Sequence, residues 1–425
     1  MARAANRGMA GRAATAVLCV PFLFVLGMQA ERTPPTAPPM KPAVRIEVAP
    51  LGYVAPGSFY LTYRLSSEAM GFFDDDHLLF TFHVGGLLQR VPNDPADDDD
   101  QQIRAVVLDV GTGKVVKQTE WRMHDRSQYL WPYKDGQFLV RVRDSLYLTD
   151  QSLMLENYMT FSEGLRVIQV SPDRRMMVVE TNYPIKLQSE PTEPRSPRAG
   201  QPVKVMILPL GSRTPIVETE GQSAVLLPLM SDGLLDTLEG KLPSHWVMRD
   251  VPFHGDPKIV AEVKSSCQPS VEPLSGKVAL MVGCYLDGDD RPVVAVSMDG
   301  EEMWRDRWQN RYVWGWFDTA ANGSRFAYES VAVSRPITLF DALYPEDVTG
   351  QLVGVYDTES GKLVLVKDAS PVLTAGQNVA LSPDGTRFAV LRDGAIEIYD
   401  LPPVEVPQKK APEVVKKKQG TGNRQ

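Results

Sequence analysis

A turn followed by a short apolar strand recurs along this chain, and this pattern restricts the fold more than any other feature. Its clearest copy is the Ser-Pro-Asp-Gly turn at residues 382–385, which separates the apolar runs 378–381 and 386–391. A second turn at residues 392–394 leads into a third run, residues 395–400. Proline presets the turn backbone, aspartate accepts hydrogen bonds from nearby amides, and glycine adopts positive φ. Runs this short and rich in β-formers predict a three-stranded antiparallel meander.

The same design recurs upstream, which predicts an array of repeats. A hydrophobic strand that closes on Asp or Gly and then turns is found six times, at Asp109, Asp150, Gly211, Asp299, Asp357 and Asp400. Successive positions are 41 to 61 residues apart, except for one step of 88 residues that holds two units around the turn at residues 231–233. A base period of about 40–45 residues is the spacing of four-stranded propeller blades. We expect seven blades, with eight as the alternative.

The first strand of the chain completes this arrangement. Residues 44–48 alternate apolar and charged side chains, which indicates a strand with one buried face. The last repeat supplies only three strands, so residues 44–48 are predicted to add the fourth and to close the ring without an open edge. The sequence therefore predicts an all-β fold, a single β-propeller of four-stranded antiparallel blades over residues 44–403.

Composition and charge narrow the class of protein. The 425 residues are 43% hydrophobic and 23% charged, as in a globular protein that buries a core. The net charge of −8 provides no basic face for nucleic acid, so we expect no nucleic-acid partner. Residues 404–425 are rich in Lys, Pro and Gln and are predicted to be a disordered, solvated tail.

The N-terminal segment has the features of an export signal. Arg3, Arg7 and Arg12 precede the apolar run 16–26, which is short for a membrane span. Residues 1–30 are therefore predicted to be a signal peptide that sends the protein to the periplasm or the outside of the cell. Met28 is larger than the residue preferred there before a cut, so an uncleaved signal anchor, which would place the chain at a membrane, is the alternative. Residues 31–43 contain five prolines and are predicted to be a linker.

Two cysteines remain after the signal segment, Cys267 and Cys284. In an exported protein this number predicts one disulfide. Cys267 ends one expected strand and Cys284 lies in the next, and a reversal at residues 273–276 would bring them across from each other. Two unpaired core thiols are the alternative.

The sequence contains no pattern to which a catalytic or metal-binding site is assigned. His77 and His83 flank one strand close to the acidic residues 74–76, and residues 97–100 are four consecutive aspartates. Both are interpreted as solvated acidic turns, since calcium ligands require spaced oxygens on a folded loop. The chain has no helical His-Glu-x-x-His, no Gly-x-Ser-x-Gly elbow and no phosphate loop. We therefore assign no catalytic residue, no metal ligand and no cofactor.

An aromatic-rich stretch is the strongest candidate for a binding surface. It spans residues 304–317 and contains Trp304, Trp308, Trp314 and Trp316. Large aromatic side chains anchor protein partners, but they also fill the space between propeller blades. Both interpretations remain open from the sequence.

The repeat motifs resemble those of the WD-repeat-like β-propellers of bacterial exported proteins, the group that includes the TolB-type and YVTN-type repeats. Residues 382–390 match the commonest blade motif of that group, and residues 171–176 are a weaker copy that lacks the glycine. The resemblance covers most of residues 44–402 as a pattern, without the Trp-Asp and Gly-His signatures of eukaryotic WD repeats. It implies a fold and no shared activity.

These observations predict a non-catalytic exported propeller that acts as a monomeric protein-binding or scaffolding module, with another protein as its partner. The alternative is an enzyme, quinoprotein-like or hydrolytic, with its active site at the mouth of the propeller channel. An enzyme requires polar groups that converge in the channel, whereas a binding module presents an aromatic or apolar surface there.

Overall fold

The structure, a computed structural model, describes residues 37–62, 65–86, 88–92, 100–124, 126–182, 202–222, 226, 228–284, 290–309, 312–335, 344–373 and 377–404. The predicted signal segment 1–30, the first part of the linker and the tail from residue 405 lie outside the described residues. Of Trp314 only the backbone is described. The described residues belong to one compact unit, and the description below concerns that unit.

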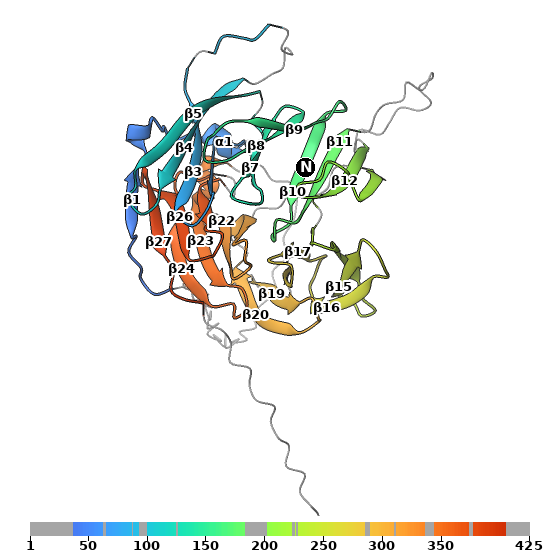
Figure 1. Cartoon of the computed structure of the whole chain (residues 1–425). Coiled ribbons are helices and arrows are strands. Elements are labelled where there is room, and N and C mark those ends of the chain that lie inside the picture. Colours follow the sequence, from blue (N-terminus) through green and yellow to red (C-terminus); the bar gives the residue numbers. More distant parts are fainter. Residues whose placement is uncertain are drawn as a thin grey trace, which may run out of the picture. The chain divides into compact units, whose positions relative to one another are not determined.

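Seven antiparallel sheets form the blades of a β-propeller, which confirms the predicted fold class and blade number. Figure 1 shows the blades following one another in chain order around a common centre. Blade 1 contains β2 (Glu68–Phe72), β3 (His77–Val84), β4 (Gln101–Asp109) and β5 (Val115–Met123). Blade 2 contains β6 (Leu130–Pro132), β7 (Phe138–Val142), β8 (Ser145–Thr149) and β9 (Glu156–Thr160). Blade 3 contains β10 (Leu165–Val170), β11 (Met176–Asn182), β12 (Val203–Pro209) and β13 (Val217–Gly221).

The second half of the chain supplies the remaining four blades. Blade 4 contains β14 (Gly233–Glu239), β15 (His245–Pro252) and β16 (Lys258–Lys264). Blade 5 contains β17 (Ser270–Pro273), β18 (Val278–Val282), β19 (Asp290–Ser297) and β20 (Glu302–Gln309). Blade 6 contains β21 (Tyr312–Thr319), β22 (Arg325–Val333), β23 (Val348–Asp357) and β24 (Leu363–Asp368). Blade 7 contains β25 (Val379–Leu381), β26 (Arg387–Arg392), β27 (Ala395–Asp400) and β1 (Val44–Glu47).

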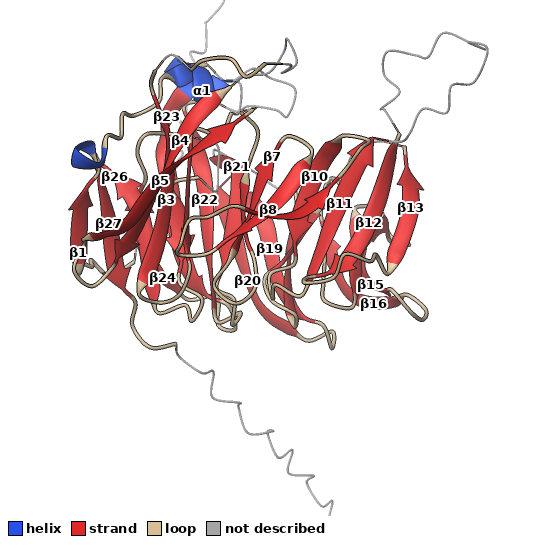
Figure 2. Cartoon of the chain, turned by 45° about the horizontal axis from the view of Figure 1, so that its top comes forward, coloured by secondary structure: helices blue, strands red, loops and turns tan. Residues whose placement is uncertain are grey.

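Helical structure is scarce in the described residues, as Figure 2 shows. It comprises the helix α1 (Ser58–Thr62) and the 3-10 turns η1 (Ala49–Leu51) and η2 (Pro345–Asp347). No helix in this part of the chain has the length and apolarity that a membrane span requires.

The hydrophobic core lies between neighbouring blades. The strand β18 is buried on both faces along its whole length, because the blades on either side pack against it. Where blades 7 and 1 meet, Ile46 and Ile398 pack in the same apolar cluster as Leu78 and Phe80. A continuous apolar run is therefore expected in a strand buried on both faces, and β18 has one, Val-Ala-Leu-Met-Val.

The N-terminal strand lies beside the C-terminal one. β1 pairs antiparallel with β27, with Val44 opposite Ile398 and Glu47 opposite Ala395. The guanidinium of Arg45 donates to Glu397 on β27 at 2.7 Å. Blade 7 therefore consists of one strand from the start of the propeller and three from its end.

Blade 4 departs from the expected four strands. Its described residues form three strands and one isolated bridge, which joins Leu229 to Leu234. Leu235 donates its N–H to the carbonyl of Pro228 at 2.9 Å, so the inner segment begins to pair with β14. Pro228 itself has no N–H to give to a ladder, and proline interrupts inner strands for this reason. As a result β14, the second strand of the motif, faces the centre of the propeller.

Cys267 and Cys284 form a disulfide, as predicted, with their Cα atoms 5.5 Å apart. Its setting differs from the prediction, because β16 ends at Lys264 and β18 ends at Val282. Both cysteines lie just beyond a strand, and the strands β17 and β18 lie between them in the chain. The bridge therefore joins the exit of blade 4 to blade 5. A disulfide is typical of proteins in oxidising compartments.

Replacing both cysteines with serine is expected to lower the free energy of unfolding by about 3 kcal/mol, because the bridge closes a loop of 17 residues. Urea unfolding of the double variant, compared with the oxidised and the reduced parent protein, measures this effect. The reduced parent should unfold like the variant; a parent whose stability does not respond to reduction would contradict the expectation.

Candidate binding site in the central cavity

The inner strands of the seven blades enclose a cavity of about 780 Å³. This volume lies within the range of pockets that bind small molecules or single side chains of a partner. Its wall combines aromatic side chains from blades 2 and 6, among them Trp131, Trp316 and Phe317, with a few charged ones. The cavity is therefore the first candidate for a functional site.

Blade 4 contributes its second strand to the wall of the cavity. Because the inner segment of that blade pairs with β14 through a single bridge, Leu235, Asp236 and Thr237 of β14 line the cavity directly. The carboxylate of Asp236 accepts two hydrogen bonds from Arg249 on the next strand, at 3.0 Å from Nε and 2.5 Å from Nη2. The charge of Asp236 is thus already balanced within the blade.

A second, smaller cavity of about 340 Å³ is formed by the turns between the first and second strands of several blades. Asp74, Asp75, Asp135 and Lys134 contribute to its wall. Arg174 lines both cavities, so its side chain lies where the two meet.

Arg174 has an unusual backbone conformation for its residue type. It is the fourth residue of the turn at 171–174, and its φ of 55° lies in the left-handed region. Gly323 and Gly385, with φ of 71° and 72°, occupy this position in blades 6 and 7. In all three turns the N–H of this residue donates to the carbonyl three residues back. Left-handed φ disfavours a residue with a Cβ atom, so blade 3 holds an arginine where the turn favours glycine.

Asp318 is the anionic side chain that faces Arg174. Its carboxylate accepts the N–H of Leu381 at 2.7 Å. Burial raises the pKa of Asp318 to about 6, although the Leu381 hydrogen bond and the Arg174 charge act in the opposite direction. Burial likewise lowers the pKa of Arg174, and the charge of Asp318 opposes this. The two groups interact across a distance, and no ion pair within 4 Å joins them among the described residues.

Glu272, on the inner strand of blade 5, is the fourth ionisable group among the described residues of the cavity wall. Burial raises the pKa of its carboxyl to about 8. No cation among the described residues forms an ion pair with it. At neutral pH Glu272 is therefore a neutral carboxylic acid that can donate as well as accept a hydrogen bond.

Replacing Glu272 with glutamine is expected to change how stability depends on pH. Its pKa is higher in the folded than in the unfolded chain, so its contribution is fully present below pH about 4.5 and is lost as the pH rises to about 8. The variant, which cannot ionise there, should gain about 2–4 kcal/mol relative to the parent between pH 5 and pH 8.5. Urea unfolding at both pH values measures the difference. If the free energy of unfolding differed between variant and parent by the same amount at both pH values, the expectation would be contradicted.

The structure distinguishes three of the four predicted tryptophans, since the side chain of Trp314 lies outside the described part. Trp308 is 8% exposed and stacks on Tyr328 with ring centroids 4.2 Å apart. Trp304 stacks on Phe326 and donates its indole N–H to the carbonyl of Thr358 at 2.9 Å. Both lie between blades 5 and 6, as the packing alternative describes. Trp316 is 37% exposed and lines the central cavity, so it remains the candidate for a binding surface.

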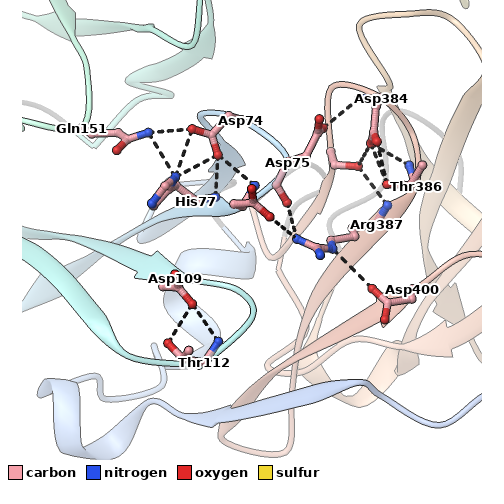
Figure 3. Close-up of polar contacts among 12 residues, drawn as sticks. Asp74, Asp75, His77, Asp109, Thr112, Gln151, Asp384, Thr386, Arg387 and Asp400 are labelled. Carbon is pink, nitrogen blue, oxygen red and sulfur yellow. Dashed lines mark hydrogen bonds and ion pairs between the residues drawn. The ribbon is translucent and has the colours of Figure 1, made fainter.

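The residues considered for a metal hold the turn of blade 1 instead (Figure 3). Asp74 accepts the backbone N–H groups of Asp76 and His77, each at 2.8 Å, and lies 2.9 Å from Nδ1 of His77. Gln151 of blade 2 donates to the same carboxylate at 2.7 Å. His83 lies at the other end of β3, next to Tyr60. In the part of the chain that the structure describes, no three His, Cys, Asp or Glu side chains are placed to hold a metal ion.

The predicted acidic run at residues 97–100 is described only at its end, since residues 97–99 lie outside the described residues. Asp100 forms an ion pair with Arg122, and its carboxylate lies 2.6 Å from Nδ1 of His124.

Comparison with known proteins supplies no function. No protein-family description and no curated protein matches this chain. Among solved structures, it is similar to the acylaminoacyl peptidase of Pyrococcus horikoshii, with 10% identity over 80% of this chain and a TM-score of 0.45. The chain spans about half (52%) of the length of that peptidase. It is also similar to the hydrazine synthase of Kuenenia stuttgartiensis, with 13% identity, 82% of this chain and 80% of that chain covered, and a TM-score of 0.32. Likenesses this distant carry no argument about activity; the fold stands on the strand pairing itself.

Proposed function

We propose that this chain is an exported, non-catalytic binding module of the bacterial WD-repeat-like propeller type, which engages another protein through its central cavity. The observation that carries the proposal is the cavity of about 780 Å³ with Trp131, Trp316 and Phe317 in its wall. Enclosed aromatic side chains are frequent anchors of protein interfaces. The signal-like segment 1–30 and the disulfide support export.

The lining of the cavity favours binding over catalysis. Among the described residues that line it there is no histidine and no cysteine. The hydroxyl of Ser171, which does line it, donates to Asp173 at 2.7 Å within its own turn. Ser382 and Asp384 make the same contact in blade 7 at 2.6 Å, so this pair is a recurring turn element rather than an activated nucleophile.

An enzyme with its site in the cavity is the second candidate, and one observation favours it. Glu272 is a protonated carboxylic acid at neutral pH in an enclosed site, which is the state that a general acid needs. A hydrolytic activity would use this group. Turnover of a substrate that is abolished by Glu272→Gln would decide for this alternative.

The binding proposal is tested by photo-cross-linking from two positions in the full chain. A photoreactive amino acid at position 316 samples the cavity, and one at position 259 samples the outer strand β16, where Ile259 is 69% exposed. We expect one protein to cross-link from position 316 and not from 259. The purified partner should then bind Trp316→Ala at least tenfold more weakly than the parent, and Ile259→Ala with parental affinity. Equal binding of both variants would contradict the proposal.

A further inference from the structure

We propose that Arg174 anchors a carboxylate of the ligand, so that the central cavity binds a peptide-like molecule or segment with a free carboxylate group next to an apolar side chain. This inference rests on the proposed binding function and specifies the chemistry of the partner.

The backbone at Arg174 gives the first reason. Its φ of 55° is one that residues with a Cβ atom rarely adopt, and the equivalent turns of blades 6 and 7 use Gly323 and Gly385 there. Non-glycine residues in left-handed conformations reduce stability and are concentrated at ligand-binding positions. The fold of the turn therefore does not require arginine at this position, and its side chain must provide something else.

The surroundings of the guanidinium give the second reason. The side chain is enclosed where the two cavities meet, yet no hydrogen bond or ion pair joins its guanidinium to any described residue. Asp318 faces it from beyond ion-pair distance and already accepts the N–H of Leu381 at 2.7 Å. Five N–H donors in a rigid fork are thus directed into an enclosed space without an acceptor. A carboxylate matches that fork with two parallel, charge-assisted hydrogen bonds.

Among the described acids in the wall of the central cavity, Asp318 is ionised at neutral pH and opposes an anion, whereas the other two do not. Asp236 is neutralised by Arg249, with hydrogen bonds of 3.0 and 2.5 Å. Glu272 is uncharged at neutral pH and can donate its O–H to an oxygen of the ligand. Trp131, Trp316 and Phe317 offer aromatic surface for the apolar part of the same molecule. A carboxylate attached to an aromatic or aliphatic group therefore fits the cavity better than a bare anion or a cation.

The adjacent arginine provides a matched control. Arg175 has the same charge, but its side chain is 76% exposed and its nearest acid, Asp173, is 3.9 Å away. It lines neither cavity. If positive charge in general attracts the carboxylate, Arg175→Gln and Arg174→Gln should weaken its binding equally. If the cavity binds it through Arg174, only Arg174→Gln should weaken binding.

The test measures binding of defined probes by isothermal titration calorimetry at pH 7. N-acetylphenylalanine presents an α-carboxylate, acetyl-Phe-Glu-amide a side-chain carboxylate, and N-acetylphenylalaninamide neither. We expect at least one of the two carboxylates to bind at least tenfold more tightly than the neutral amide. This preference should disappear in Arg174→Gln and persist in Arg175→Gln. The carboxylate probe that binds more tightly shows whether the natural ligand presents an α-carboxylate or a side-chain carboxylate.

A second variant separates loss of carboxylate binding from loss of stability. Arg174→Gly restores the residue used in blades 6 and 7, so its melting temperature should equal or exceed that of the parent while carboxylate binding is lost. A melting temperature lowered by several degrees would show a structural role for Arg174 and overturn the proposal. Equal binding of acid and amide, absence of binding by both carboxylates, or the same loss in Arg175→Gln would also overturn it. If the cross-linked partner still requires Trp316 in such a case, the binding function stands and only the carboxylate inference fails.

Discussion

Replacing Arg325 with methionine is expected to lower the free energy of unfolding by about 3–5 kcal/mol, because it leaves a buried carboxylate without its partner. Arg325 and Asp357 are 1% and 2% exposed, and Nε of Arg325 donates to Asp357 at 2.8 Å. The same guanidinium donates to the carbonyl of Gly385 at 2.7 Å and to that of Pro402. It therefore joins blade 6 to blade 7 through two carbonyls of blade 7, while Asp357 lies in blade 6 itself.

The exposed pair Arg305–Glu302 is the control for this prediction. Its side chains are about half exposed, at 53% and 48%, with the charged atoms 2.7 Å apart. Exposed pairs contribute at most about 1 kcal/mol, so Arg305→Met should change the stability little. Urea unfolding of both variants measures the two effects. Equal losses would show that burial of the Arg325 pair has no special consequence.

Deleting residues 43–48 is expected to abolish the cooperative unfolding transition of the propeller. The deletion removes β1 from blade 7 and exposes the edge of β27, whose residues pair with it from Val44–Ile398 to Glu47–Ala395. It also removes Ile46, which packs in the cluster shared by blades 7 and 1. An open edge and a lost core cluster at the closing blade affect the whole ring, because each blade packs on its neighbours.

Two point variants test the same prediction with smaller changes than the deletion. Ile46→Ala removes part of that cluster and should lower the free energy of unfolding by about 2–5 kcal/mol. Glu47→Ala changes a side chain that is 60% exposed and should have little effect. Thermal and urea unfolding followed by circular dichroism measure all three variants. A deletion variant that unfolds cooperatively at the parental midpoint would contradict the closing role of β1.

A polar link between blades 7 and 1 also closes the ring, and it too depends on residues far apart in the sequence (Figure 3). Arg387 of blade 7 donates to the carbonyl of Asp75 at 2.6 Å and to the carboxylate of Asp76 at 2.9 Å, both in the first turn of blade 1. The N–H of Asp384 donates to Asp75 at 3.2 Å. The two ends of the propeller are thus joined by hydrogen bonds on the turn side as well as by strand pairing.

The repeat architecture could be predicted because its determinants are local. A turn such as residues 382–385 needs proline, aspartate and glycine in adjacent positions, and the apolar runs around it have the length of strands. The disulfide was also predictable, since Cys267 and Cys284 are the only cysteines after the signal-like segment. Blade 4 was the exception, and Pro228 within an apolar run was the available signal that its inner strand would be interrupted.

The cavity could not be predicted, because its lining depends on which strand of each blade becomes the innermost. Trp308 and Trp316 are close in sequence, but β20 is the outer strand of blade 5 and β21 the inner strand of blade 6. In the sequence, Asp318 and Glu272 do not differ from other polar residues of strands. They line the cavity because β21 and β17 are the inner strands of their blades. The sequence contained one indication that Arg174 is special: it stands where the turn motif at residues 171–176 would have glycine.

Fluorine NMR of the protein labelled with 5-fluorotryptophan tests most directly whether ligands enter the central cavity. The chain has seven tryptophans, and single Trp→Phe variants assign their resonances. With N-acetylphenylalanine added, the resonance of Trp316 should shift while those of Trp304 and Trp308, packed between blades 5 and 6, stay in place. Shifts confined to Trp304 and Trp308, with Trp316 unchanged, would contradict the cavity as the binding site.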